Sequence, residues 1–449
     1  MPRPDTFADA PRSNPRSPDP ASRANWFRAA ISLVLIASIA GADLRELNAV
    51  AGPEPGATVA IVGATLIDGH GGPPLADAAV VVRDNQITAV GPRGSITIPE
   101  RASVVDARGL TLLPGLLDSH FHLGGPRGNL PAEFLAHGIT SLRDPGAWIE
   151  SYEGARQSGE PIPRLFLTGP HLDNPPAAYP RNSLIVRDEE ETRLAVNRFI
   201  DDGASAIKVY FRLPLGLIRV VTETAHARGA VVVAHLEIVD ARDAIRAGVD
   251  GIEHATSFGT ALLPLRDAEA YRQSMLADNA YRNEGRYQVW SQLDLDGPQA
   301  GDLYRLIVEQ GTFVSPTLAV FERRDGDDNA TDVHVRGFEN MLRFVGRVRK
   351  AGGRVVVGSH SFVPHAERGW AYQREMELLV EAGLTPIETL VAGTMENARF
   401  FRVEDRLGSV EAGKLADLLL IEGDPLEDIR AMRNVRGVML NGRWIVSPE

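Results

Sequence analysis

Between residues 114 and 404, short apolar runs of β type alternate with helical stretches. This alternation is typical of a parallel sheet whose strands are joined by crossover helices. Eight runs can be counted, and eight β/α units predict an α/β protein built on a closed (β/α)8 TIM barrel. The runs lie at residues 111–120, 138–144, 163–169, 205–211, 230–237, 249–256, 311–318 and 353–360. A chain of 449 residues has room for such a barrel and an accessory domain.

The segments on either side of this alternation have a different texture. Residues 57–112 and 405–449 consist of short β-type runs separated by Gly, Asp and Asn turns. That leaves residues 113–404 for the barrel. Within it, residues 260–304 exceed a normal connection and contain an apparent helix, so we predict either a lid over the barrel mouth or a peripheral packing insertion.

The first 42 residues differ from the rest of the chain. Residues 1–28 are rich in Pro, Ser and Arg, and the apolar run AAISLVLIASIAGA follows at 29–42. The run is shorter than the roughly 20 residues that a membrane-spanning helix needs. A basic start, a short apolar core and an A-x-A end are typical of an export signal. We therefore predict a signal peptide at 1–42, with an uncleaved anchor and a buried helix as alternatives, and a linker at 43–56.

The predicted signal bears on where the protein is found, and the composition bears on which partners and metal ligands it can have. Export would place the protein in the periplasm or outside the cell, with membrane contact only if residues 29–42 remain as an anchor. The net charge of −12 argues against nucleic acid as a partner, because nucleic-acid-binding proteins usually carry a basic surface. The chain has no cysteine, so any metal must be held by His, Asp, Glu or Lys side chains.

Histidines gather at the carboxyl ends of the predicted barrel strands, where TIM barrels build their active sites. Five of the 11 histidines fall there, together with one lysine. A single histidine on an apolar strand is usually a packed structural residue, but five at one rim indicate a metal site. The six residues are His120, His122, Lys208, His235, His254 and His360.

The spacing of His120 and His122 has a physical reason. Residues i and i+2 of a strand point to the same side, so both imidazoles can hold one ion while Phe121 faces away. Neutral imidazole is a good ligand for zinc and similar metals. A protonated Lys208 beside a metal would be repelled. It therefore needs either an ion pair with a nearby carboxylate or a chemical change.

The order and spacing of several motifs resemble the amidohydrolase superfamily, in particular its imidazolonepropionase-like and prolidase-like members. The motifs are GLLDSHFHL, AIKVY, VVVAHLE, GIEHAT, FVSPTL, EAGLTPIETL, NARFF and LGSVEAGKLADLLLIEGDP. The resemblance covers nearly all of residues 57–449. It implies a (β/α)8 barrel with a small β-sandwich made from both chain ends, here residues 57–112 and 405–449.

The resemblance also implies a centre of two divalent metal ions. In relatives with this pattern, the H-x-H pair binds one metal, a carboxylated lysine bridges both, and the histidines that end strands five and six bind the second. Carried over, these are His120 and His122, Lys208 with a CO2-derived carbamate, and His235 and His254. Carboxylation would turn a repelled cation into an anionic bridge. Nitrogen and oxygen ligation rich in histidine favours zinc, while manganese, cobalt and iron also fit.

The eighth predicted strand departs from the family pattern. In the family that this chain resembles, the eighth strand normally ends Gly-Thr-Asp, and the aspartate touches the metal centre and shuttles a proton. Here the residues are Gly358-Ser359-His360, so His360 is predicted to stand in for the catalytic aspartate. A neutral imidazole removes a negative charge from a cationic site, which lowers its own basicity. His360 therefore marks a working variant, a metal-binding barrel that has lost most catalysis, or an inactivating substitution.

Two further residues are predicted to touch substrate. Tyr210 lies two residues after Lys208 and faces the same interior, where it is either a substrate contact or part of the core. His171 ends the third strand region and is expected to line the pocket. Asp144, at the end of the second strand, either orients a ligand histidine or caps a helix.

Taken together, these features predict an exported, metal-dependent hydrolase that cleaves an amide or peptide-like C–N bond in a small substrate by means of metal-activated water. The resemblance suggests dipeptides, N-acyl amino acids or cyclic amides, with lactones and phosphotriesters within the family's range. The alternative is a non-catalytic metal- or ligand-binding barrel, or an inactivated form of such a hydrolase. The expected partner is a small molecule, and the sequence leaves a homo-oligomer open.

Overall fold

Eight short parallel strands form a ring in a computed structural model of the protein, which describes residues 46–48, 50–123 and 130–448. Each strand lies inside one of the eight runs predicted from the sequence, so the barrel prediction is confirmed. The strands are β6 (Leu116–Asp118), β7 (Ile139–Asp144), β8 (Arg164–Leu167), β11 (Ala206–Val209), β12 (Val231–Ala234), β13 (Gly251–Glu253), β14 (Phe313–Ser315) and β15 (Arg354–Val355).

Backbone hydrogen bonds join the ring at its two seams. Strands β6, β7 and β8 pair in parallel, and so do β11 through β15. Ser205 N donates to Leu167 O at 2.9 Å at one seam, and Ser119 N donates to Val357 O at 3.0 Å at the other. The short strands β9 (His171–Asp173) and β10 (Ser183–Ile185) extend the sheet beside β11. This closure brings the carboxyl ends of all eight strands to one rim.

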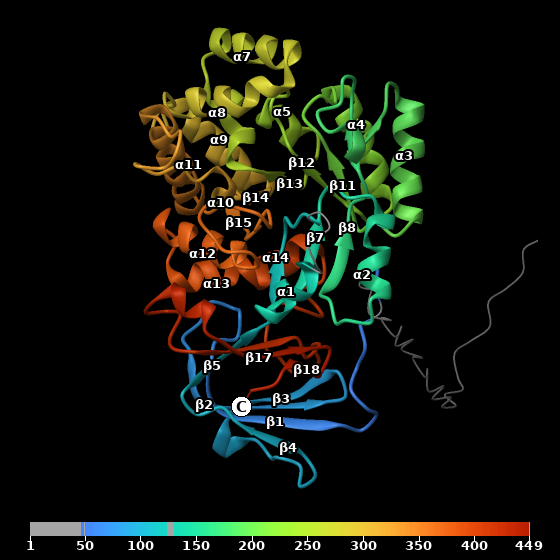
Figure 1. Cartoon of the computed structure of the whole chain (residues 1–449), viewed down its shortest axis with the longest axis vertical. Coiled ribbons are helices and arrows are strands. Elements are labelled where there is room, and N and C mark those ends of the chain that lie inside the picture. The colour runs from blue at the N-terminus through green and yellow to red at the C-terminus, as the bar shows by residue number, and fades with distance from the viewer. Residues whose placement is uncertain (1–45, 49, 124–129, 449) are drawn as a thin grey trace, which may run out of the picture. The chain divides into compact units, whose positions relative to one another are not determined.

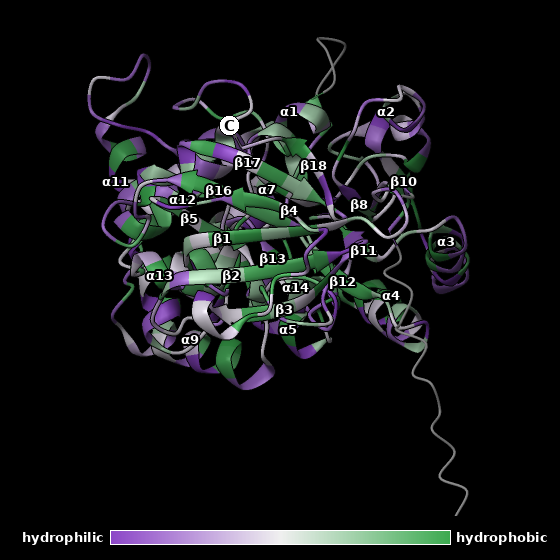
Figure 2. Cartoon of the chain, turned by 90° about the horizontal axis from the view of Figure 1, so that it is seen from below, coloured by the Kyte–Doolittle hydropathy of each residue, from purple (hydrophilic) through white to green (hydrophobic). Residues whose placement is uncertain are grey.

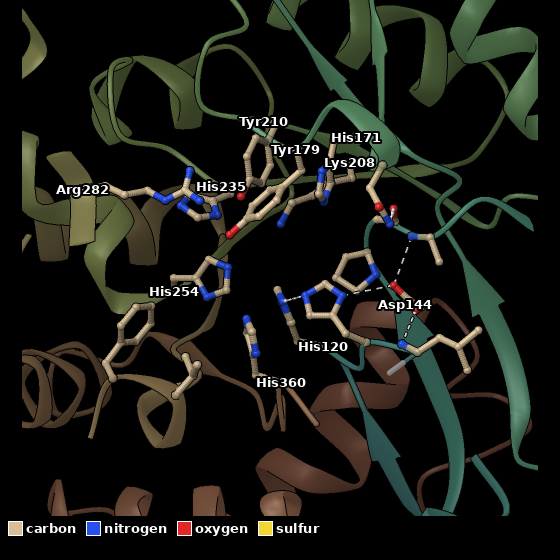
Figure 3. Close-up of a pocket in the computed structure, with 18 of the residues that line it drawn as sticks. His120, Asp144, His171, Tyr179, Lys208, Tyr210, His235, His254, Arg282 and His360 are labelled. Atoms are coloured by element: carbon tan, nitrogen blue, oxygen red, sulfur yellow. Dashed lines mark hydrogen bonds and ion pairs between the residues drawn. The ribbon is translucent and has the colours of Figure 1, made fainter. Parts of the chain in front are cut away.

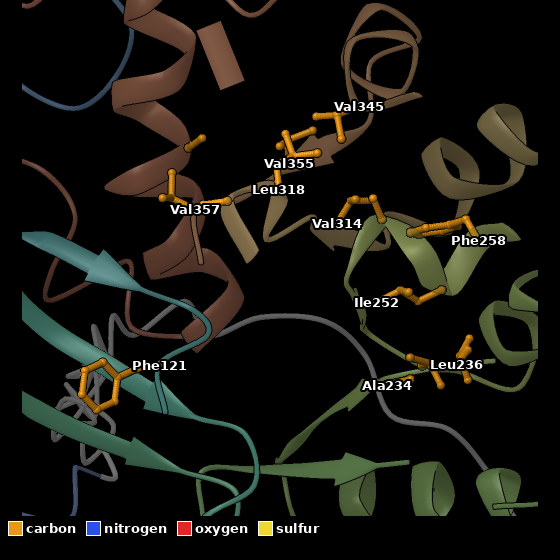
Figure 4. Packing of buried hydrophobic residues seen from close by; sticks show 14 of the residues in the cluster. Phe121, Ala234, Leu236, Ile252, Phe258, Val314, Leu318, Val345, Val355 and Val357 are labelled. Carbon is orange, nitrogen blue, oxygen red and sulfur yellow. The ribbon is translucent and has the colours of Figure 1, made fainter. Parts of the chain in front are cut away.

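The barrel strands form because their side chains are apolar and the helices around the ring bury them. All four residues of β12, VVVA, are buried, as expected for a parallel strand covered on both faces. Figure 4 shows Ala234, Ile252, Val314 and Val355 of successive strands within one packed cluster. This packed layer between the strands and the helices is therefore a rigid support for the residues at the rim.

Helices follow most of the strands and surround the ring (Figure 1). The clearest amphipathic helix, α11 (Asp332–Lys350), buries Phe338, Met341, Leu342 and Val345 at helical spacing. The other helices are α1 (Leu130–Ala136), α2 (Glu153–Gln157), α3 (Glu189–Asp201), α4 (Leu215–Ala227), α5 (Ala241–Arg246), α6 (Gly259–Leu262), α7 (Leu265–Ala277), α8 (Arg282–Trp290), α9 (Pro298–Gln310), α10 (Leu318–Phe321), α12 (Ala371–Glu381), α13 (Pro386–Gly393) and α14 (Met395–Phe401).

The segment 260–304 adds helices α7 and α8 between β13 and β14. Figure 1 shows α7 at one end of the barrel, and strands β1–β4 lie beyond the opposite end. Helix α8 packs on α11: Asn340 Nδ2 donates to Trp290 O at 2.8 Å, and a Cβ on Gly337 would lie 2.9 Å from Tyr287 O. The segment is thus packed against the barrel, and a lid movement remains a prediction.

Both chain ends build one mixed sheet, in which β5 pairs antiparallel with β16. Side chains of β1, β2, β5, β16 and β17 share one apolar cluster, and Figure 2 shows the hydrophobic character of β1 and β2. The prediction of a small β domain built from both chain ends is confirmed, and its strands form one eight-stranded sheet. Its strands are β1 (Thr58–Leu66), β2 (Leu75–Arg83), β3 (Gln86–Pro92), β4 (Ser103–Asp106), β5 (Leu110–Pro114), β16 (Leu418–Glu422), β17 (Val435–Leu440) and β18 (Arg443–Val446).

The first predicted barrel strand, residues 111–120, is divided between the two sheets. Leu110–Pro114 belongs to the small domain, and only Leu116–Asp118 joins the barrel. Gly115 lies between the two parts. A larger residue would not fit there, because a Cβ would lie 2.3 Å from Thr140 Oγ1. The prediction of one continuous strand is wrong here, since a run of apolar residues does not reveal a change of partner sheet.

The predicted export segment, residues 1–42, lies outside the described residues, as does part of the predicted linker at 43–56. Of the helices within the described residues, none has both the length and the apolar character needed to cross a membrane.

Candidate metal centre

The carboxyl ends of the barrel strands open into a cavity of about 380 Å³. Figure 3 shows side chains from different strands pointing toward one another across it. The cavity lining includes every residue that the sequence predicted as a ligand, an acid/base or a substrate contact: His120, His122, His171, Lys208, Tyr210, His235, His254 and His360.

The H-x-H pair converges as its spacing predicts. The Nε2 atoms of His120 and His122 lie 3.0 Å apart, and both rings line the cavity. Phe121 points the other way and packs edge-on against Phe134, with ring centroids 5.0 Å apart. Two imidazole nitrogens this close can share a proton or bind one ion together.

His360 completes a cluster with this pair. Its ring stacks on His120 at 5.2 Å between centroids and lies 4.8 Å from the ring of His122. One ligand atom from each of the three residues falls within 4.8 Å of the others. The cluster can therefore hold a metal ion through three imidazoles.

A buried carboxylate, Asp118, ties the strand ends that carry this cluster. Its Oδ1 accepts from His120 N at 3.0 Å and from Ser359 N at 2.9 Å. Burial raises the pKa of Asp118 to about 6. Gly358 is required beside it, because a Cβ there would lie 2.7 Å from His120 Cβ. Asp118 thus fixes His120 and His360 relative to each other.

His235 and His254 form the second part of the cluster. Their ring centroids lie 4.4 Å apart, and His254 lies 4.6 Å from His120. His254 Nδ1 is 2.7 Å from Thr317 Oγ1, and His235 Nε2 is 3.2 Å from Glu237 Oε1. Such contacts fix the ring orientation and tautomer of a histidine whose other nitrogen faces a metal.

Lys208 forms an ion pair with Glu253, and both side chains are fully buried. The other oxygen of Glu253 lies 3.3 Å from His120 Nδ1. Burial lowers the pKa of Lys208 well below its usual value. The contact with Glu253 matches the ion-pair alternative for Lys208, whereas the lowered pKa favours the neutral amine, which is the form that reacts with CO2.

Burial favours the neutral form of four histidines of the cluster, His120, His235, His254 and His360. Burial lowers the pKa of His120, His254 and His360 well below the usual value, and neighbouring positive groups add to the effect. The pKa of His235 falls to about 3 for the same reason. Neutral imidazole has a free lone pair, which metal ligation requires.

Asp144 contacts His122 from outside the cavity centre. Asp144 Oδ1 lies 3.4 Å from His122 Nδ1, and its Oδ2 accepts from Tyr152 Oη at 2.8 Å and from Leu123 N at 2.9 Å. Its carboxylate also accepts from Ala147 N in the turn after β7. Asp144 therefore orients a histidine and caps a turn at the same time.

His171 and Tyr210 form one wall of the cavity. Their rings stack with centroids 4.1 Å apart, and Tyr210 lies 4.8 Å from the ring of His235. Gly146 makes room for this wall, because a Cβ there would lie 2.2 Å from His171 Nε2. Both residues line the cavity, and their contact with a substrate remains a prediction.

Several residues in or next to the cavity were missed by the sequence reasoning. Asp118 and Glu253 lie within the quoted motifs GLLDSHFHL and GIEHAT, so their closeness to the predicted ligands was the available signal. Arg282 and Arg286 of α8 line the cavity from the long insertion, and Tyr179 reaches it from the loop after β9. No sequence pattern singles out these three residues, because only the tertiary fold brings them to the barrel rim.

A barrel that gathers histidines and a lysine at the carboxyl ends of its strands has the layout of a metal-dependent hydrolase. The amidohydrolase family matches residues 111–445, and the chain belongs to that family. Membership of this family classes the protein as a hydrolase. The histidine clusters are suited to the divalent metals that enzymes of the family generally bind.

Individual relatives agree with this family. The chain is similar to ochratoxinase of Aspergillus niger, with 24% identity over 450 residues that cover 85% of each chain. It is also 25% identical over 368 residues to an uncharacterized protein of Mycobacterium tuberculosis, covering 74% of this chain and 84% of that one.

Solved structures show the same fold. A putative prolidase from Bifidobacterium longum superposes with a TM-score of 0.66 and 25% identity over 88% of this chain and 96% of that one. A Xaa-Pro dipeptidase with bound methionine in its active site gives a TM-score of 0.67 and 23% identity over 87% of this chain and all of that one.

Proposed function

We propose that the protein hydrolyses an amide or peptide-like C–N bond in a small substrate with metal-activated water. The observation that carries this proposal is the convergence of His120, His122, His235, His254 and His360 on one cavity. A volume of about 380 Å³ suits a small molecule. Relatives named dipeptidase, prolidase and ochratoxinase support the same reaction class.

The side chains fit divalent metal ions. One ligand atom each from His120, His122 and His360 falls within 4.8 Å of the others, and so does one each from His120, Glu253 and His254. Imidazole nitrogen with carboxylate oxygen favours zinc, although manganese, cobalt and iron accept the same donors. When bound, the metal would lower the pKa of a water molecule and polarise the scissile carbonyl.

Lys208 as a carbamate is part of this proposal. A neutral lysine amine adds to CO2 and releases one proton, which leaves an anionic carbamate on Nζ. Glu253 is in contact with Lys208, so the carbamate would place two anions side by side in a buried site. Bound cations would offset that repulsion, and we therefore expect carbamate formation and metal binding to depend on each other.

His360 is proposed to move the proton that an aspartate moves in relatives with this pattern. Its neutral ring faces the cavity beside His120 and His122, where it can accept a proton and pass it to the leaving nitrogen. The lowered pKa makes His360 a weak base, so turnover is expected to be slow.

The test is an assay of amine release from dipeptides and N-acyl amino acids. Protein stripped with a chelator is compared with protein reloaded with zinc in bicarbonate. We expect release only from the reloaded protein, and loss of release in His122→Ala. Equal release with and without metal would contradict the proposal.

The rival function is a metal- or ligand-binding barrel without turnover. His360 in place of the catalytic aspartate is the observation that favours it. The ratio of metal to protein separates the two: a ratio near two fits the enzyme, and one or zero without amine release fits the rival.

A further inference from the structure

Among the described residues, three basic side chains line the cavity, and two of them contact a carboxylate. Lys208 pairs with Glu253, and Arg286 Nη2 lies 2.9 Å from Glu237 Oε1. The third is Arg282, the first residue of α8. Its surroundings differ from those of the other two.

The Arg282 guanidinium has no ion pair and no hydrogen bond within the described part of the chain. The residue is only 9% exposed, and its Nη1 is buried without a hydrogen-bond partner there. Its Cζ lies 4.8 Å from the ring centroid of Tyr179 and 5.3 Å from that of Phe211. These aromatic contacts hold the guanidinium but supply no acceptor for its N–H groups. A buried cation without an acceptor is costly, so the site is arranged for an anion.

The acidic side chains around the cavity are already engaged elsewhere. Glu237 accepts from Tyr271 Oη at 2.7 Å in addition to its pair with Arg286. Asp144 is held by Tyr152 and by backbone amides on the other side of the cavity. Within the described ranges of the chain, these carboxylates leave none for Arg282, so we expect the anion that would satisfy it to come with a ligand.

We propose that Arg282 binds a free carboxylate of the substrate. The substrates would then be N-acyl amino acids or short peptides with a free carboxyl end, and not cyclic amides. This inference rests on the hydrolase function proposed above. A planar guanidinium pairs with both oxygens of a carboxylate, which fixes orientation as well as charge. Figure 3 shows Arg282 beside His235 and next to the Tyr179 ring, so a carboxylate held there leaves the rest of the molecule facing the histidines.

The test compares two probes that differ only in charge, N-acetyl-L-leucine and N-acetyl-L-leucinamide. Each is titrated into zinc-loaded protein by calorimetry, in which binding gives saturable heat and turnover gives continuous heat. We expect the carboxylate to bind about 10- to 100-fold more tightly than the amide, because a charge-assisted hydrogen bond is lost with the amide.

Variants of Arg282 test whether this residue carries the preference. Arg282→Gln should lose most of the preference through weaker carboxylate binding and leave the binding of the amide unchanged. Arg282→Lys should retain part of it. The matched control is Arg305→Gln, because Arg305 is an exposed arginine on α9 that pairs with Asp302. Thermal melting of each variant shows whether it is folded.

Equal binding of the two probes to the unmodified protein would overturn the inference, even if the variants fail to fold. A preference that survives in a folded Arg282→Gln would also overturn it. The protein could instead prefer the carboxylate probe but give no continuous heat with any dipeptide or N-acyl amino acid. That result would contradict the hydrolase function and still support a carboxylate site at Arg282.

Discussion

His360 has a backbone conformation that residues other than glycine rarely adopt. Its φ is +59°, and the next residue, Ser361, has a φ of +64°. Hydrogen bonds hold this turn: His360 N donates to His120 O at 2.7 Å, and Ser361 N donates to Ser359 Oγ at 3.0 Å. Such conformations persist where the surroundings fix them, often at functional sites. The fold therefore sets the place of this side chain, and an aspartate at 360 would present its carboxylate to the same cluster.

Glu253 offers a prediction at the residue scale. Glu253→Gln keeps the size of the side chain but removes the charge that contacts His120 Nδ1 and Lys208. We expect the affinity for zinc to fall by about 10- to 100-fold, as is common when the residues behind metal ligands are changed. Competitive titration against a coloured zinc chelator measures the affinity.

The matched control is Glu309→Gln, since Glu309 is an exposed residue of α9. This variant should bind zinc like the unmodified protein. An unchanged zinc affinity in Glu253→Gln would show that Glu253 neither orients a ligand nor contributes to the charge of the centre.

Gly115 carries a prediction at the scale of elements. Gly115→Ala should strain the point where the chain passes from β5 to β6, because the added Cβ would lie 2.3 Å from Thr140 Oγ1 and 2.5 Å from Thr140 Cγ2. Overpacking of this kind costs about 1–3 kcal/mol. Urea unfolding followed by circular dichroism measures the loss.

A second substitution separates steric strain from other effects. Thr140→Ala removes the two closest atoms, so the double variant should recover much of the stability that Gly115→Ala loses. Additive losses in the double variant would contradict the steric explanation.

The buried carboxyl group of Glu375 leads to a prediction of how the stability of the protein depends on pH. This buried residue of α12 accepts from Leu318 N at 2.9 Å and from Ala319 N at 2.7 Å at the start of α10. Burial raises the pKa of Glu375 from 4.5 to about 8, and the charges of Asp118 and Glu322 add to the rise. Between these two values the folded state keeps a proton that the unfolded state has lost. The free energy of unfolding should therefore fall as pH rises from about 5 to about 8, by at most about 1.4 kcal/mol per pH unit.

Urea unfolding at several pH values tests this in Glu375→Gln. The variant should be less stable at pH 5, because its amide nitrogen cannot accept from Ala319 N, and its stability should vary less with pH. An equally steep dependence in the variant would show that other groups cause it.

At the scale of the whole molecule, the sequence was sufficient to predict the barrel and to place the candidate ligands at its rim. The strands of a parallel barrel are buried on both faces, so they stand out as apolar runs, and their carboxyl ends lie on one rim by topology. The partners behind the histidines could not be predicted in this way. The contacts of Asp118 with Ser359 and of Arg286 with Glu237 join residues far apart in sequence, and only packing brings them together.

Export is a prediction about the whole chain. The apolar run that ends at Ala40-Gly41-Ala42 supports a cleaved signal, and we propose a periplasmic or secreted protein. Mass spectrometry of the protein from the cells that produce it should find a chain that begins after residue 42. A native chain that begins at Met1 would contradict cleavage.

The measurement that tests the central claim most directly compares the protein with its His360→Asp variant. Both are loaded with zinc in bicarbonate, their metal content is counted, and both are assayed on dipeptides and N-acyl amino acids. We predict two metals per chain and measurable turnover in the unmodified protein. His360→Asp is expected to be faster by up to about 10²–10⁴, the usual contribution of a general base. Turnover in the variant alone would contradict the account and make the natural chain a binding barrel.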